Sequence, residues 1–334
     1  MPISVNSPSK YCQQPIRVGL VGTGYAAKLR AETLQADPRS HIVAVSGHTP
    51  ANTEEFSQSY QALALTSWGD LVDRQDVDLV IICTVNRDHS AIARAALEKG
   101  KHVVVEYPLS LDVDEAEELI ALAESKDKLL HVEHIELLGG LHQALQQFLP
   151  AIGNTFYARY STINPQRPAP RKWTYNKELF GFPLSAALSR IQRFTDLFGQ
   201  VSSVSCQTQY VESDDEFYKS CICTAGLKFT SGLVAEVIYG KGESFWQPSR
   251  LFEVHGEQGA LIFDGDQGKL LNENGTTPIE VGTRRGLFAK ETSMVLDHLI
   301  DGTPLYITPE ASVYALKVAD AAHRSAQTGE TILL

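Results

Sequence analysis

The stretch IRVGLVGTGYAA, residues 16–27, decides the fold of this chain. Its apolar first half predicts a buried strand, and the residues after it predict a helix over about 26–36. Between the two, Gly22, Gly24 and Ala27 fit the pattern GxGxx(G/A) of dinucleotide-binding turns, in which the second glycine lets the backbone approach a pyrophosphate. We therefore predict that the turn binds a dinucleotide through Gly22, Thr23, Gly24, Tyr25 and Ala26.

Outward from this turn, apolar runs alternate with amphipathic segments. Near-continuous apolar runs are typical of parallel strands covered on both faces, and helices connect such strands. The pattern predicts a doubly wound Rossmann domain over residues 16–135, an α/β fold. Its further strands are expected at HIVAVSG (41–47), DLVIICTV (78–85), KHVVVEYP (101–108) and LLHVEHIELL (129–138), with helices at 89–100 and 112–128.

The pattern changes in the second half of the chain. Half-buried strands separated by turns follow one another, and only two helices are expected, at about 184–198 and 309–327. Residues 136–334 are therefore predicted to form a substrate-binding α+β domain with a large, mostly antiparallel sheet. Residues 1–15 lack an apolar period and are expected to be a disordered tail.

Composition narrows the classes of function. The 334 residues carry a net charge of −11, which argues against general binding of nucleic acid or anionic membranes. Five cysteines without a CxxC pair indicate neither a disulfide framework nor a zinc site, so no metal is expected. No signal peptide or bilayer-spanning run is visible, and we expect a cytoplasmic protein.

The end of the second strand bears on the choice of cofactor. An acid there would bind the adenine-side ribose hydroxyls of NAD, but the sequence VAVSGHTPAN, residues 43–52, has none. Ser46, His48 and Thr49 can instead donate to a phosphate, which favours NADPH and leaves NADH as the alternative. At the end of a later strand, Thr84, Asn86 and His89 are expected to face the cofactor, although His89 equally fits a local role at a helix start.

These features together resemble the glucose–fructose oxidoreductase and inositol dehydrogenase family over about residues 16–330. The resemblance rests on the glycine turn, the segment from Thr84 to His89, the EYP turn at 106–108 and the second domain. Sugar-oxidising members carry a lysine between the glutamate and proline of that turn, and an aspartate and a histidine four apart on a helix. This chain has Tyr107, Ser185 and Ser189 instead, so it lacks the groups that deprotonate an alcohol.

One branch of that family shares the replacements. The segments EYP, LLHVEHIELLGG, WTYN, FGFPLSAALSRIQRFTDLFG, AEVIYGKGE and RRGLF are similar to biliverdin reductases of the cyanobacterial type. The resemblance implies NADPH-dependent reduction of biliverdin to bilirubin, with a hydride added at the central methine carbon and a proton at a pyrrole nitrogen. The alternatives are a dehydrogenase of a sugar or another small substrate, and a non-catalytic dinucleotide-binding relative.

The predicted site residues follow from this hypothesis. Glu106 and Tyr107 end a parallel strand and should lie beside the nicotinamide; the alternative for Tyr107 is a core position. By resemblance, Arg190 is expected to lie nearest the reacting nitrogen, and Arg193, three residues further along the helix, is expected to support it. The alternative is that the two arginines form ion pairs, for example with Asp196 or Glu178.

Three further residues complete the predicted bilin site. Arg171 and Trp173 lie in a basic, aromatic and proline-rich loop that suits a flat dianion, although a solvated loop has the same composition. Glu133 belongs to a polar cluster at two strand ends, for which a structural role is also open. The small-molecule bilin is the expected partner, and the oligomeric state, monomer or homodimer, stays open.

Overall fold

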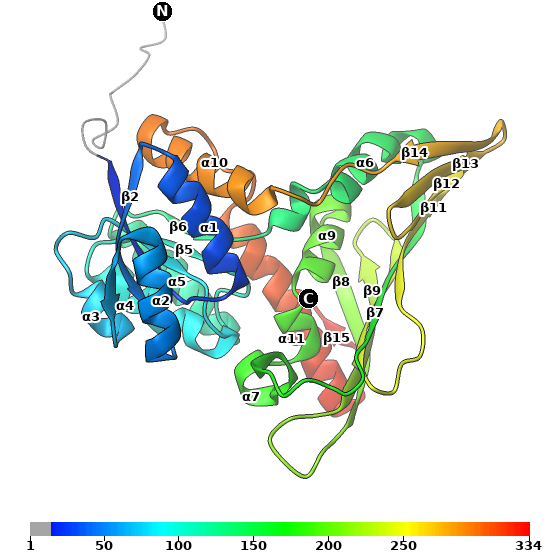
Figure 1. Cartoon of the computed structure of the whole chain (residues 1–334). Helices are drawn as coiled ribbons and strands as arrows, with labels where there is room; N and C mark the ends of the chain where they lie inside the picture. The colour runs from blue at the N-terminus through cyan, green and yellow to red at the C-terminus, as the bar shows by residue number, and fades with distance from the viewer. Residues whose placement is uncertain (1–14) are drawn as a thin grey trace, which may run out of the picture.

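A computed structural model describes residues 15–334, so the predicted tail falls almost entirely outside the described residues. Figure 1 shows the N-terminal α/β layers beside a broad sheet, with helix α11 between the two and helix α10 alongside α1. The predicted fold class, a parallel Rossmann sheet followed by an α+β domain, is confirmed. In the described part of the chain, no helix is both long and apolar enough to cross a bilayer.

The N-terminal sheet has six parallel strands in the order β3-β2-β1-β4-β5-β6. Its central strands are buried along their whole length, as their continuous apolar runs predict, because helices cover both faces. The strands are β1 (Ile16–Val21), β2 (Ser40–Ser46), β3 (Leu63–Leu65), β4 (Leu79–Ile82), β5 (His102–Val105) and β6 (Leu130–Val132). The helices are α1 (Tyr25–Ala36), α2 (Pro50–Tyr60), α3 (Trp68–Val72), α4 (His89–Glu98) and α5 (Val113–Ser125).

The second sheet has nine strands in the order β14-β13-β12-β11-β7-β10-β9-β8-β15. Only the pairing of β7 with β10 is parallel, and every other described pairing is antiparallel. The strands are β7 (Thr155–Pro165), β8 (Val201–Val211), β9 (Ser220–Phe229), β10 (Val234–Gly242), β11 (Ser249–Gly256), β12 (Gly259–Asp264), β13 (Gln267–Asn272), β14 (Gly275–Glu280) and β15 (Ile332–Leu333).

Helices on one face of this sheet face the Rossmann domain (Figure 1). The helix expected at 184–198 is broken into α8 (Pro183–Ala186) and α9 (Ser189–Phe198), because the backbone leaves the helical region at Ala187, with φ −104° and ψ 40°. Helix α11 (Pro309–Thr328) matches its predicted range and contacts α5, α9 and β8. The short helices are α6 (Gly140–Phe148) and α7 (Lys177–Phe180), and single 3-10 turns occur at 86–88, 135–137, 149–152 and 173–175.

Helix α10 (Leu287–Asp301) was not anticipated from the sequence, and it packs against α1. Val295, Leu296 and Leu299 join the apolar cluster of the Rossmann strands, which includes Val18 and Leu20. Helix α10, which follows the last strand hairpin of the second sheet, therefore returns to the first domain and completes its core.

Candidate functional site

The glycine turn has the geometry that a bound pyrophosphate needs. Gly22 adopts φ +116°, and a Cβ atom there would lie 2.2 Å from the Cys83 carbonyl oxygen, so only glycine fits. Gly24 precedes α1, and a Cβ atom there would meet nothing within 4 Å. No side chain caps this helix, so its first N–H groups remain available to an anion. These residues fit a dinucleotide.

The loop after β2 surrounds the expected position of the adenosine. Ser46 is buried, and its carbonyl oxygen accepts a 2.7 Å hydrogen bond from the Gly22 N–H. His48 and Thr49 are exposed at the start of α2, so their side chains are accessible to a ligand. Tyr25 is exposed as well, with its ring edge-on to Phe288 at 6.3 Å between centroids.

The segment after β4 differs from the expectation. Asn86 is buried, and its side-chain amide donates to the Phe180 carbonyl oxygen at 2.9 Å, which ties the two domains together. His89 is fully buried, with Nδ1 2.8 Å from the Pro108 carbonyl oxygen and Nε2 3.3 Å from that of Thr84. Burial lowers the pKa of His89, so the ring is neutral. The side-chain N–H of Asn86 and both ring nitrogens of His89 are thus engaged by backbone carbonyl groups of the protein.

Tyr107 lies where β5 leaves the sheet and meets the second domain. Its ring stacks on His134, with centroids 5.2 Å apart and planes 7° from parallel. Its hydroxyl lies 3.2 Å from the Ser189 Oγ at the start of α9. Burial raises the pKa of Tyr107 to about 12, although the nearby Arg190 works in the opposite direction. The phenol is therefore protonated at neutral pH.

Arg190 carries a guanidinium without a carboxylate partner in residues 15–334. Its Nε donates to the Thr162 Oγ1 at 3.3 Å, its Nη1 donates to the Ser189 Oγ at 3.1 Å, and its Cζ lies 5.1 Å from the centroid of the Tyr239 ring. The side chain is half-buried. Glu136 acts on this guanidinium at longer range, but no carboxylate of residues 15–334 forms an ion pair with it, so this position can receive an anion.

Arg193 lies differently from the expectation. It is 2% exposed, and its Nη2 donates to a Glu136 carboxylate oxygen at 2.6 Å. The same carboxylate also pairs with Arg284. Arg193 therefore anchors the 135–137 turn to α9 through Nη2, whereas its buried Nη1 has no hydrogen-bond partner among residues 15–334. The sequence-based alternatives named other partners, but Asp196 bonds His142 instead and Glu178 pairs with Arg87.

The predicted site residues of the loop before α7, Arg171 and Trp173, contact other parts of the same domain. Arg171 is exposed and forms an ion pair with Asp215, with its guanidinium 5.0 Å from the Phe217 ring. Trp173 is half-buried and packs near Phe180, with ring centroids 5.8 Å apart. For Arg171 the structure thus favours the solvated-loop interpretation, because a carboxylate already satisfies its charge.

A buried ionic network underlies the EYP turn. Arg30 of α1 donates to Glu106 at 2.9 Å and to Glu291 of α10 at 2.5 Å. Glu291 also bonds His131 at 2.9 Å and Tyr306 at 2.7 Å. Glu106 at the strand end is thus held by groups from the first and last parts of the chain, and no cluster in residues 15–334 has the composition of a metal site.

Glu133 is buried beside this network and not at the surface of a cleft. Its carboxylate accepts a 2.6 Å hydrogen bond from the Ile135 N–H. Burial and the neighbouring Glu106 and Glu291 raise its pKa well above the ordinary range. Glu133 is therefore held inside the network by burial and by the Ile135 N–H, and its contact with a substrate stays a prediction.

Two family models match the chain. The oxidoreductase family with an NAD-binding Rossmann fold matches residues 16–134, and its C-terminal alpha/beta domain matches residues 150–334. The chain belongs to this oxidoreductase family.

Among members of this family, the crystal structure of a biliverdin reductase from Synechocystis sp. PCC 6803, with biliverdin and NADP⁺ bound, is 53% identical to this chain. It covers 94% of this chain and 99% of the other, with a TM-score of 0.92. Human biliverdin reductase A is 31% identical over 207 residues, which are 62% of this chain and 66% of that protein, a little under two thirds. A 3-ketoreductase from Actinomadura kijaniata, 21% identical over 93% of this chain and 98% of its own with a TM-score of 0.82, shows the shared fold.

Several residues that lie close to Arg190 or in the same domain were not predicted from the sequence. Thr162 and Tyr239 come from adjacent strands and contact Arg190, but nothing in their sequence neighbourhoods points to α9. Lys241 is buried and has no acidic partner among the described residues; its Nζ donates to the Thr174 carbonyl oxygen and lies 3.8 Å from the Phe180 ring centroid. Burial lowers its pKa to about 8. The segment AEVIYGKGE, already part of the resemblance, contained the signal for Tyr239 and Lys241.

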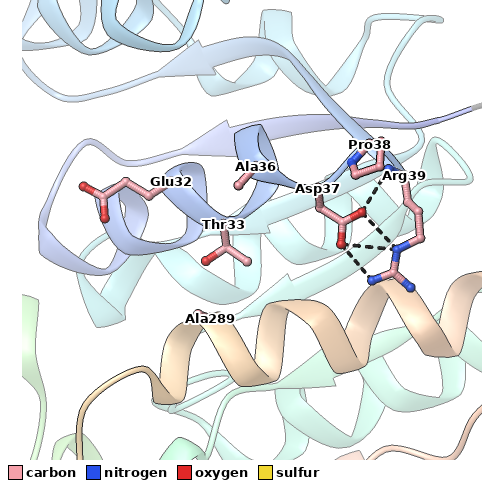
Figure 2. A pocket seen from close by; sticks show the side chains of 7 residues that line it. All are labelled: Glu32, Thr33, Ala36, Asp37, Pro38, Arg39 and Ala289. Carbon is pink, nitrogen blue, oxygen red and sulfur yellow. Dashed lines mark hydrogen bonds and ion pairs between the residues drawn. The ribbon is translucent and has the colours of Figure 1, made fainter.

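A surface depression of about 630 Å³ lies between α1 and α10, away from this site (Figure 2). It is at the C-terminal end of α1, whereas Gly24 precedes the N-terminal end. Its lining residues are Glu32, Thr33, Ala36, Asp37, Pro38, Arg39 and Ala289. Figure 2 shows Arg39 turned back onto Asp37, which satisfies the charges of both. The depression therefore has no part in the cofactor site.

Proposed function

We propose that this chain reduces biliverdin to bilirubin and takes the hydride from NADPH. One arrangement carries the proposal: the guanidinium of Arg190 has hydroxyl and aromatic neighbours but no carboxylate among residues 15–334, and Ser189 joins it to Tyr107. The Synechocystis relative, whose crystal structure contains biliverdin and NADP⁺, supports both the substrate and the cofactor.

The chemistry of biliverdin suits this arrangement. Biliverdin is a flat, conjugated tetrapyrrole with two propionates. A guanidinium can pair with a carboxylate through two parallel bonds, and it can also stack on a flat ring. The Tyr239 ring lies against Arg190, and Tyr107 is joined to it through Ser189, so aromatic side chains accompany the cation. A small sugar would leave this cation and these rings without complementary groups.

The proposed roles divide between the two domains. The Gly24 turn and the α1 N-terminus would hold the pyrophosphate, and His48 and Thr49 the phosphate on the adenosine ribose. When bound, NADPH supplies the hydride for the methine carbon. Tyr107 would orient the bilin through its ring, and Arg190 would hold a propionate or polarise the pyrrole nitrogen that receives the proton.

The alcohol-oxidising alternative finds no support among the same residues. Tyr107 stands where the resembling sugar dehydrogenases carry a lysine, and Ser185 and Ser189 stand near their aspartate and histidine. Serine hydroxyls do not take a proton from an alcohol at neutral pH. No specific contact of this chain favours a sugar.

The direct experiment mixes the purified protein with NADPH and biliverdin. We expect the red absorbance of biliverdin to fall while yellow bilirubin appears, and the rate with NADH to be lower. A panel of sugars with NADP⁺ serves as the comparison. Turnover of a sugar, with none of biliverdin, would overturn the proposal.

Oligomeric state and location complete the proposal. The outer face of the nine-stranded sheet carries polar pairs, with Arg159 bonded to Glu253 at 2.5 Å and Tyr157 to Glu236 at 2.7 Å. Because burying such pairs costs desolvation free energy, we favour a monomer over a face-to-face homodimer, which sedimentation velocity can check.

We also infer a cytoplasmic location, in keeping with free thiols at Cys83, Cys206, Cys221 and Cys223. A fluorescent fusion would test the location.

A further inference from the structure

Ser189 lies between the two side chains on which the proposed function depends. It is the first residue of α9 and is 5% exposed. Its Oγ is 3.2 Å from the Tyr107 hydroxyl and 3.1 Å from the Arg190 Nη1. The side chain thus connects a phenol at the end of a Rossmann strand with a guanidinium of the second domain.

The hydroxyl groups of Tyr107 and Ser189 together have one hydrogen that their contact does not use. A guanidinium can only donate, so the Ser189 oxygen accepts from Arg190. The bond between the two hydroxyls of Tyr107 and Ser189 uses one of their two hydrogens, whichever group donates. Within residues 15–334 the second hydrogen has no recorded acceptor. It is available to a molecule bound beside Arg190.

We propose that Ser189 is the central member of a proton relay, which passes a proton from Tyr107 to the pyrrole nitrogen of the bilin while Arg190 holds the two hydroxyls in place. The inference rests on the proposed biliverdin reduction and deepens it. Ser189 differs in this respect from Arg190, which gives up a proton reluctantly because guanidinium is a very weak acid.

The relay balances as a proton transfer. The Ser189 O–H bond breaks as an N–H bond forms on the pyrrole nitrogen, and the Tyr107 proton moves to the Ser189 oxygen. The hydride reaches the methine carbon separately from NADPH, so the bilin gains one hydride and one proton. Tyr107 is left as a phenolate beside the positive charge of Arg190 and regains a proton from water. The high pKa of Tyr107, about 12, keeps its proton in place until the bilin becomes basic.

The test compares Ser189→Ala with Ser185→Ala. Ser185 is also 5% exposed and lies on α8, but its side chain forms no hydrogen bond with the part of the chain from residue 15 onward, so Ser185→Ala controls for loss of a buried hydroxyl. We expect S189A to slow single-turnover biliverdin reduction at saturating NADPH by about tenfold or more, as loss of a general acid does. S185A should keep the wild-type rate, and Ser189→Thr should restore most of the rate because it keeps a hydroxyl.

Two further readouts separate a relay from a merely structural role. In D₂O the isotope effect on the S189A rate should exceed that of the wild type, because proton transfer has become the slow step; a misplaced bilin would slow hydride transfer and leave the isotope effect unchanged. The double variant S189A/Y107F should be about as slow as the slower single variant, because both changes break one chain of hydroxyls.

Several outcomes would overturn the relay. They are a wild-type rate in S189A, an equal loss in S185A, an unchanged isotope effect, or multiplying effects in the double variant. Thermal melting checks that each variant folds, and Ser189→Cys, a weaker donor of similar size, replaces S189A should alanine not fold. If the wild-type protein itself leaves biliverdin unreduced, the proposed function fails; if only the variants behave as wild type, the relay alone fails.

Discussion

Arg190 and Arg193 show that helical spacing predicts which side of a helix a residue shares, but not which neighbours it meets. Three residues apart, they share one side of α9, and the sequence offers no reason to separate them. In the structure Arg193 meets Glu136 and is buried, whereas Arg190 faces Thr162 and Tyr239. The difference comes from which neighbour the tertiary fold brings to each guanidinium.

We predict that Arg190→Ala lowers the rate of biliverdin reduction on the order of a hundredfold, as loss of one preorganised donor to developing charge does. NADPH affinity should be nearly unchanged, because the glycine turn and α1 hold the cofactor. Stopped-flow reduction and NADPH fluorescence titration measure the two quantities. Arg94→Ala, which removes a surface ion pair with Glu118, is the matched control. Equal losses of rate and NADPH affinity in R190A would contradict the assigned role.

Cofactor preference is a second property set by single residues. We expect His48→Asp to lower the ratio of kcat/KM for NADPH to that for NADH by about tenfold, since an exposed like charge near a phosphate costs on the order of 1–2 kcal/mol. Gln58→Asp adds the same charge further along α2 and should leave the ratio unchanged. A constant ratio in H48D would remove His48 from the phosphate site.

At the scale of the element, the turn between β1 and α1 was predictable almost residue by residue. Its geometry is local, because a positive φ at Gly22 and a small side chain at Ala27 are demands of the turn itself. The α8–α9 segment was less predictable. Its apolar pattern indicates one helix, but the chain bends at Ala187 to fit between the sheet and the Rossmann domain.

The two glycines of the turn should respond differently to alanine. Gly24→Ala has room for its Cβ, so the protein should keep its melting temperature while the Kd for NADPH rises about tenfold or more through loss of close backbone contacts to phosphate. Gly22→Ala meets the Cys83 carbonyl at positive φ, and should cost about 1–3 kcal/mol of stability. Calorimetry and NADPH titration would decide; a destabilised G24A with normal affinity would contradict the assignment.

At the scale of the whole molecule, α10 joins the end of the chain to its beginning. Its Glu291 is fully buried against Arg30 of α1, and Arg30 in turn holds Glu106 beside the proposed nicotinamide position. The return of α10 thus completes both a core and a buried ion network. Helix α10 therefore packs on the N-terminal sheet domain although it comes from the second half of the sequence.

We predict that Glu291→Ala lowers the free energy of unfolding by about 3–5 kcal/mol, because it leaves Arg30 with a buried and only partly compensated charge. Urea unfolding followed by circular dichroism measures the change. Lys290→Ala, on the exposed side of the same helix, is the matched control and should change stability by less than about 0.5 kcal/mol. A loss in E291A no larger than in K290A would show that the network contributes little.

The sequence by itself determined the Rossmann domain, the glycine turn, the sheet-rich second half and, through Tyr107 and Ser189, the loss of alcohol-handling groups. The first three features follow from local periods and turn chemistry, which depend on neighbours along the chain, and the last is what the family resemblance implies. Only the tertiary structure decided that Arg190 stays free of carboxylates, that Arg193, His89 and Glu133 are engaged in packing, and that α10 returns to α1. Such choices depend on partners more than 50 residues away for Arg193, and about 260 away for Arg30, and no local pattern carries that information.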